Sequence, residues 1–402
     1  FLIHRLCTIY TWLPILPSII LEKISYAFTF EDEPTVIEIT KTSLTDGKEL
    51  EGAKLQVTDE SGKVVDSWIS GKEAHIIKEL VVGQKYTLTE TKPADGFVTA
   101  ESITFTVEDT VEAQKIEMKD DVTKVEISKT DISGKELPGA KLTILDKDGK
   151  TVESWTSEEK PHYIEMLPIG EHTLREESAP DGYLVAEDVK FTVEDTGEIQ
   201  KVEMKDDVPT GTIIINKNGE FLDKVTALDS VGGWIKHLFQ YVTGSLKDVT
   251  FEVFALEDVK SADGESEDYY KKDELVATIT TDDTGIAKIS GLPLGKYYVK
   301  EKATVDGFVL DDEAREIDLT YRDQDTAEVT YSADWQNNRQ KAEVEVVKKE
   351  KDSDRVLEGA VFALCAKDDI TGADGKVILK ADTMIEELAT DKEGKLTFTA
   401  DL

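Results

Sequence analysis

From about residue 34 onward, the chain consists largely of short runs in which apolar and polar residues alternate. Such a run predicts a strand with one buried face, because successive strand side chains point to opposite sides. The runs are rich in Val, Ile and Thr and are separated by Asp-Gly, Ser-Gly and Pro-containing turns. This pattern predicts an all-β fold built of sandwich domains.

The same pattern recurs along the chain at a period of about 86 to 88 residues. GKELEGAKL at 47–55 returns as GKELPGAKL at 134–142, and DSWIS returns as ESWTS. A period of this length indicates an array of small domains, each able to close its own core. We expect four repeats: repeat 1 (34–121), repeat 2 (122–207), repeat 3 (208–341) and repeat 4 (342–402), the last one truncated.

In each full repeat, three strands have an apolar face whose last residue is polar or charged. Val125 and Ile127 share a face with Lys129, for example, and His172 and Leu174 share one with Glu176. By the same parity the three sets are Lys41, Glu90 and Asp120; Lys129, Glu176 and Asp206; and Lys217, Glu301 and Asn337. A single charged residue could end its strand by bending into water. The threefold repetition instead predicts buried sites with a chemical role.

Composition excludes several classes of function. The net charge of −37 over 402 residues argues against nucleic acid and anionic membranes as partners. Two cysteines, Cys7 and Cys365, provide neither a disulfide framework nor a thiolate metal site. Familiar catalytic and phosphate-binding motifs are missing, so we expect no enzyme, no cofactor and no metal. The five histidines lack ligand spacing and are interpreted as structural: His4, His75, His162, His172 and His237.

Two segments depart from the repeat pattern. Residues 1–33 stay unassigned: their apolar start imitates a signal peptide, whereas residues 26–33 imitate the last strand of a missing repeat. Repeat 3 carries an insert at about 221–244, which contains GGWIKHLFQYV. We expect a short helix here, with Trp234, Leu238 and Tyr241, or Ile235, Phe239 and Val242, on one face. The helix would cover a sandwich edge or, less simply, bind a partner.

Repeat 4 opens with Val344, Val346 and Lys348 on one face and stops before a glutamate or a closing strand. By position Lys348 therefore corresponds to Lys41, Lys129 and Lys217.

At these residues the chain resembles a known family. The opening K-T/D strand, the GKELPGAKL segment, the LxE…APDGY motif and the closing M-K-D or N-x-R-Q strand are similar to the collagen-adhesin B-type, or SpaA-type pilin, repeats of Gram-positive surface proteins. The resemblance covers roughly residues 28–402 and is most specific in repeat 2. Repeat 1 departs from it with KPADGF (92–97) in place of APDGY, which shifts the proline. The resemblance implies tandem prealbumin-like (Ig-like) β-sandwich domains of Greek-key type.

The resemblance also implies a spontaneous isopeptide bond between a first-strand lysine and a last-strand Asp or Asn. Carried over, the bonds would be Lys41–Asp120, Lys129–Asp206 and Lys217–Asn337, assisted by Glu90, Glu176 and Glu301. Lys348 would be a crosslinking lysine whose partner is missing from this sequence. Strand parity favours the first residue of each closing pair over Asp121, Asp207 and Asn338, and the NxRQ spacing also favours Asn337 over its competitor Asn338. Burial makes such chemistry plausible, because it favours a neutral, nucleophilic amine and a protonated acid.

We therefore expect a structural stalk of a secreted, cell-wall-anchored bacterial adhesin, located at the cell surface, with self-crosslinking as its only chemistry. Its partners would be a host matrix protein or another surface ligand, and the cell wall through an anchor beyond this sequence. The repeats would not enter a membrane. A sortase-assembled pilin subunit is an alternative, although no pilin-motif lysine or LPxTG-type signal is seen. Spacer or ligand-binding repeats attached to a surface enzyme are another, with repeat 3 and its insert as the candidate ligand-binding unit.

Overall fold

The structure is a computed structural model that describes residues 33–229, 234–262, 267–372 and 374–401. All regular elements within these ranges are strands. The closing strand expected at residues 26–33 falls almost wholly outside the described residues. One compact unit ends at Val122 and a second begins at Thr123, and each is described by itself.

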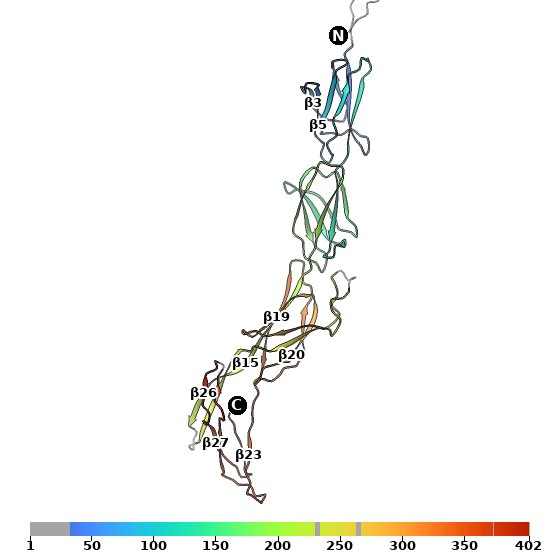
Figure 1. Cartoon of the computed structure of the whole chain (residues 1–402). Helices are drawn as coiled ribbons and strands as arrows, with labels where there is room; N and C mark the ends of the chain where they lie inside the picture. Colours follow the sequence, from blue (N-terminus) through green and yellow to red (C-terminus); the bar gives the residue numbers. More distant parts are fainter. Residues whose placement is uncertain (1–32, 230–233, 263–266, 373, 402) are drawn as a thin grey trace, which may run out of the picture. The chain divides into compact units, whose positions relative to one another are not determined.

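Repeat 1 is a sandwich of two sheets with orders β4-β1-β7 and β3-β2-β5-β6 (Figure 1). Its strands are β1 (Val36–Ser43), β2 (Lys54–Asp59), β3 (Val64–Ile69), β4 (His75–Lys78), β5 (Lys85–Lys92), β6 (Ile103–Thr106) and β7 (Gln114–Asp120). Ile37 and Ile39 of β1 pack with Leu88 of β5 and Met118 of β7, so the alternating apolar residues form the core between the sheets.

Repeat 2 opens the second unit and has the same architecture, with sheets β11-β8-β14 and β10-β9-β12-β13. Its strands are β8 (Lys124–Thr130), β9 (Lys141–Asp146), β10 (Thr151–Thr156), β11 (His162–Glu165), β12 (Gly170–Ser178), β13 (Val189–Val193) and β14 (Ile199–Lys205). Val125, Ile127, Leu174 and Met204 occupy its core. The prediction of tandem all-β sandwich domains is therefore confirmed for both repeats.

The first and last strands of each repeat lie side by side and run parallel. In repeat 1 the register sets Lys41 opposite Met118 and Ser43 opposite Asp120. In repeat 2 Lys129 is opposite Met204, one pleat before Asp206. Each lysine thus points to the same face as the acid two residues beyond its direct partner.

Repeat 3 repeats this arrangement with longer strands. They are β15 (Thr210–Asp229), β16 (Ile235–Ser245), β17 (Thr250–Ala255), β18 (Leu275–Thr280), β19 (Ile286–Pro293), β20 (Gly295–Ala303), β21 (Arg315–Leu319) and β22 (Glu328–Asn337). One sheet has the order β18-β17-β20-β21, and β15 of the other sheet pairs with β19 and with β22. The register of β15 and β22 sets Lys217 opposite Trp335 and Gly219 opposite Asn337.

The prediction of a helix in the insert of repeat 3 is wrong. Residues 218–229 continue β15 and pair antiparallel with β16, so the insert is a long β-hairpin. Val225 and Phe239 are a cross-strand pair of this hairpin. The segment GGWIKHLFQYV has apolar residues at spacings that suit both a helix face and a strand face, so its periodicity did not distinguish the two.

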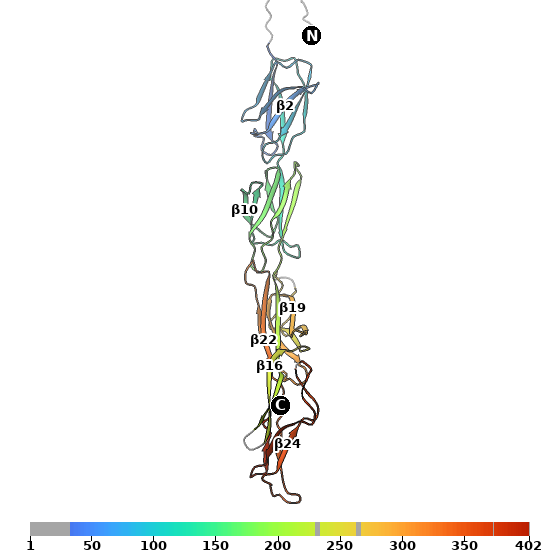
Figure 2. The ribbon, with the colours of Figure 1, turned by 90° about the vertical axis from the view of Figure 1, so that its left-hand side faces the viewer.

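The hairpin also does more than cover a sandwich edge, because it joins the sheet of repeat 4. The strands of repeat 4 are β23 (Glu345–Val347), β24 (Val361–Cys365), β25 (Ile370–Thr371), β26 (Val377–Leu379), β27 (Met384–Ala389) and β28 (Lys395–Thr397). β16 pairs with β27 at Lys236 and Glu386, which also form an ion pair at 3.3 Å. Figures 1 and 2 show the yellow-green hairpin beside the red strands of repeat 4.

Apolar and polar contacts hold the hairpin to repeat 4. Val225 and Phe239 pack on a small core of repeat 4 that contains Leu379 and Ile385. The Tyr241 hydroxyl donates to the Asp401 carbonyl at 2.9 Å. The insert of repeat 3 therefore supplies part of the core of repeat 4.

We expect Phe239→Ala to lower the stability of repeat 4 by about 2 kcal/mol, since it removes a half-buried ring from that core. Hydrogen exchange in β24 and β27 measures the effect, and both strands should exchange faster. Leu238→Ala is the matched control, because Leu238 is 39% exposed and adjacent in the same strand. Unchanged exchange in the Phe239 variant would show that repeat 4 closes its core without the hairpin.

Candidate functional site

Each full repeat buries its lysine between the two sheets. Lys41, Lys129 and Lys217 are 2%, 1% and 1% exposed. Each lies on the first strand of its repeat, and the Asp or Asn comes from the end of the neighbouring last strand. The glutamate reaches the lysine from the facing sheet, on β5, β12 or β20. The fold thus brings together, in one buried place per repeat, three residues far apart in sequence.

In repeats 1 and 2 the lysine contacts both acids. Lys41 Nζ lies 3.0 Å from Glu90 Oε1 and donates a hydrogen bond to Asp120 Oδ1. Lys129 Nζ lies 3.1 Å from Glu176 Oε1 and donates a similar bond to Asp206 Oδ1. The side chains of all four acids are fully buried. Amine and carboxyl are therefore held in contact, away from bulk water.

The two aspartates have strongly perturbed acidity. Burial raises the pKa of Asp120 to about 7, although the neighbouring lysine acts in the opposite direction. Burial raises the pKa of Asp206 to about 7 for the same reason. A site with one lysine and two carboxyls is neutral when one carboxyl is protonated, so burial favours a neutral Asp. A protonated carboxyl is a far better electrophile than a carboxylate.

The site of repeat 3 carries an amide in place of this carboxyl. Glu301 bridges its two partners: Oε2 lies 2.8 Å from Lys217 Nζ, and Oε1 accepts a hydrogen bond of 2.6 Å from Asn337 Nδ2. Asn337 Nδ2 also donates to Thr304 Oγ1 at 2.8 Å. Burial lowers the pKa of Lys217, which favours the neutral amine. One carboxylate is thus in contact with both the amine and the amide nitrogen.

Backbone contacts hold the acids in place. Ala100 N donates to Glu90 Oε2, and Ala186 N donates to Glu176 Oε2, both at 2.7 Å. The loop after each glutamate also binds the residue that follows the Asp or Asn. These bonds are Val98 N to Asp121 O, Leu184 N to Asp207 O and Val309 N to Asn338 O, at 2.8 to 2.9 Å. Sequence reasoning missed these contacts because backbone amides carry no residue signature.

Two polar residues stand next to each other at the end of each last strand, and the first of them is the buried one, as strand parity predicts. Asp120, Asp206 and Asn337 are buried, whereas Asp207 and Asn338 are exposed and Asp121 is half-buried. In repeat 4 Lys348 is exposed, one residue beyond the short strand β23. The structure therefore does not place Lys348 in a buried site like those of the other three lysines.

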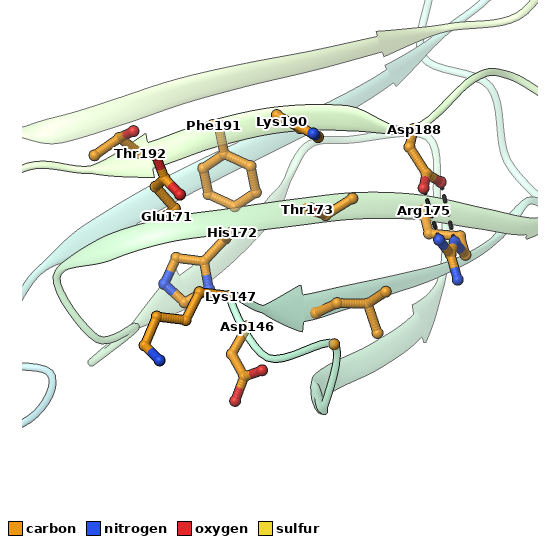
Figure 3. Close-up of a pocket in the computed structure, with 12 residues that line it drawn as sticks. Asp146, Lys147, Glu171, His172, Thr173, Arg175, Asp188, Lys190, Phe191 and Thr192 are labelled. Carbon is orange, nitrogen blue, oxygen red and sulfur yellow. Dashed lines mark hydrogen bonds and ion pairs between the residues drawn. The ribbon is translucent and has the colours of Figure 1, made fainter.

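A surface hollow in repeat 2 lies apart from the buried site (Figure 3). It is lined by residues of β9, β12 and β13, including His172 and Phe191, whose rings stack at 5.6 Å. Arg175 and Asp188 at its rim form the paired bonds dashed in Figure 3. His172 Nε2 is bonded to the Pro168 carbonyl at 2.8 Å, which fits a structural role. Lys129, Glu176 and Asp206 do not line this hollow.

Neither a metal site nor a membrane-spanning helix is found in the described part of the chain. Its His, Cys, Asp and Glu side chains form no cluster of three or more that could hold a metal ion. The described ranges also contain no helix long and apolar enough to cross a membrane.

Comparison with solved structures finds proteins of low identity. The Bacillus anthracis TIE protein is 24% identical with a TM-score of 0.45, over 76% of this chain and 51% of its own, so this chain spans about half its length. BcpA, the major pilin subunit of Bacillus cereus, is 15% identical with a TM-score of 0.39, over 77% of this chain and 100% of its own. No curated protein sequence matches.

A family model gives the decisive comparison. The SpaA model, described as a prealbumin-like fold domain, matches residues 35–122, 123–208 and 240–335. These matches cover more than half of the chain and contain all but two of the residues of the three buried sites that were expected from the sequence. The two exceptions, Lys217 and Asn337, flank the third match. The chain belongs to the SpaA family of prealbumin-like fold domains.

Proposed function

We propose that this chain is a structural stalk segment of a bacterial cell-surface protein, braced by three intramolecular isopeptide bonds. The bonds would join Lys41 to Asp120, Lys129 to Asp206 and Lys217 to Asn337. One observation carries the proposal: in two repeats a buried lysine amine touches a buried aspartyl carboxyl, with a glutamate in contact. A charged lysine in such a place has no evident structural purpose that an apolar residue would not serve better.

The arrangement supports an amide condensation. The neutral lysine amine attacks the Asp carboxyl carbon, a C–N bond forms, and one C–O bond breaks to release water. The glutamate beside both groups moves the proton from the amine to the leaving oxygen. Contact between the reactants supplies an effective molarity of about 10⁵–10⁸ M. The reaction occurs once per repeat, so the chain modifies itself and is no enzyme in the usual sense.

Strand order gives the bond its mechanical value. The first and last strands of a repeat are neighbours, and the bond would join them near the point where the chain leaves the repeat. Tension would enter the first strand, cross the covalent bond and leave, so that the residues between the two bonded positions carry no load. Closing a loop of about 80 residues also limits the unfolded state, by about 4–5 kcal/mol. Secretion and anchoring to the cell wall complete the proposed role.

Intact mass with tryptic peptide mapping tests the bonds. The chain should be lighter than its sequence by two waters and one ammonia, with the three joined peptides present. Glu176→Ala should restore one water by preventing the bond of repeat 2 alone. Glu177→Ala is the matched control, since this exposed neighbour points away from the site. A mass equal to that of the sequence would refute the bonds.

Pulling single molecules by their ends tests the stalk role. We expect no unfolding extension from repeats 1 to 3 in the wild-type chain, because the load bypasses the folded strands. Glu176→Ala should add one extension step, that of repeat 2. Unfolding of crosslinked repeats at ordinary forces would contradict a load-bearing role even where the mass data support the bonds.

The pH dependence of bond formation should differ between the sites. A carboxyl with a pKa of about 7 is neutral below pH 7 and ionised above it. Bond formation in repeats 1 and 2 should therefore slow as pH rises through about 7, whereas Asn337 in repeat 3 has no such proton to lose. Time courses of cell-free synthesis between about pH 6 and pH 9, followed by peptide mapping, measure all three bonds in one molecule. Equal pH profiles would contradict the raised aspartate pKa as the cause.

A further inference from the structure

The site of repeat 3 contains a hydroxyl that the sites of repeats 1 and 2 lack. Thr304 follows Glu301 by three residues, and the corresponding residues after Glu90 and Glu176 are Pro93 and Ala179. Neither has a side-chain hydroxyl. The difference accompanies the change of electrophile, because repeats 1 and 2 present an Asp and repeat 3 presents Asn337.

Thr304 contacts Asn337 Nδ2, the nitrogen atom that would leave as ammonia when the isopeptide bond forms. Asn337 Nδ2 donates one hydrogen bond to Glu301 Oε1 at 2.6 Å and a second to Thr304 Oγ1 at 2.8 Å. Both amide hydrogens are thus engaged, which fixes the plane of the amide. Lys217 Nζ is on the other oxygen of Glu301, at 2.8 Å. The amine and the leaving nitrogen are therefore connected through one carboxylate.

We propose that Thr304 is a catalytic residue for the release of ammonia in repeat 3, an inference that rests on the isopeptide bond proposed above. Lys217 Nζ attacks the side-chain carbonyl carbon of Asn337, and the C–N bond to the lysine forms as the bond to Nδ2 breaks. One proton passes from the amine through Glu301 to Nδ2, which leaves as ammonia. Atoms balance, and neither oxidant nor cofactor takes part.

The hydroxyl suits this step because its hydrogen-bonding role can reverse. A planar amide nitrogen only donates hydrogen bonds, and Thr304 Oγ1 accepts one. When the carbonyl carbon becomes tetrahedral, the nitrogen becomes a basic amine with a lone pair. The same hydroxyl can then rotate and donate to that lone pair, an interaction that exists only after attack. Water is a better leaving group than an amide nitrogen, so the Asp sites need no such donor.

The test compares variants of the full chain that differ only at position 304. Thr304→Val removes the hydroxyl and keeps the shape, and we expect the Lys217–Asn337 bond to form about 10- to 100-fold more slowly. Thr304→Ser keeps the hydroxyl and should restore the wild-type rate, which a purely structural role for the side chain would not predict. The Lys41–Asp120 and Lys129–Asp206 bonds in the same molecules are internal controls. Time courses from cell-free synthesis, read by peptide mapping, give all three rates.

Each outcome bears on a separate claim. A wild-type rate in Thr304→Val, or an equally slow bond in Thr304→Ser, overturns the role of Thr304 while leaving the isopeptide bond intact. A wild-type chain that never joins Lys217 to Asn337 refutes the proposed function of repeat 3 instead. Thr304→Ala, with resistance of repeat 3 to proteolysis as the measure of folding, separates slow chemistry from a failure to fold.

Discussion

Each full repeat is organised around a lysine side chain that is buried between two apolar sheets. A lysine ammonium between two apolar sheets would be strongly destabilising without partners, and removing one partner of a buried pair is typically worse than never having the pair. Repeats 1 and 2 meet this constraint by bringing one oxygen from the neighbouring strand and another from the facing sheet to the same nitrogen. In repeat 3 the oxygen comes from Glu301 of the facing sheet. Strand order, register and the length of the last strand must all agree for this to happen. The acidic groups respond in turn, since burial favours the neutral form of each aspartate.

The sequence was sufficient to predict the features that depend on the two-residue alternation of strand side chains. Two-residue alternation placed Asp206 inside and Asp207 outside because the backbone leaves no other choice along a straight strand. It also predicted the sandwich fold, since the alternating runs recur between turns. Prediction failed where that period stops applying. Thr304 lies just past the end of β20, in a loop where side-chain direction is not set by alternation.

One further failure has a different physical cause. The insert of repeat 3 has apolar residues at several spacings, and the contact that selects a hairpin comes from repeat 4, more than a hundred residues away. The crosslinking role of Lys348 stays a prediction, since Lys348 is exposed here and follows a strand of only three residues, Glu345–Val347. The hairpin also changes how repeats 3 and 4 are related, because strands of both belong to one sheet. A sequence divided at its repeat boundaries would separate elements that share a core.

The pairing of first strand with last strand also has a consequence for the order of events when the chain is made. Lys41 meets its acid 79 residues later, and Lys129 meets its acid 77 residues later. During synthesis the N-terminal end of a repeat is made first, so the strand that carries the lysine has no last strand to pair with until the final residues of the repeat are made. Contacts of such long sequence separation also form slowly. Only the docking of the last strand completes the site. A covalent bond at this site would form only after the whole repeat had folded. Once the bond had formed, the repeat could no longer be extended into a linear chain and passed end-first through a pore.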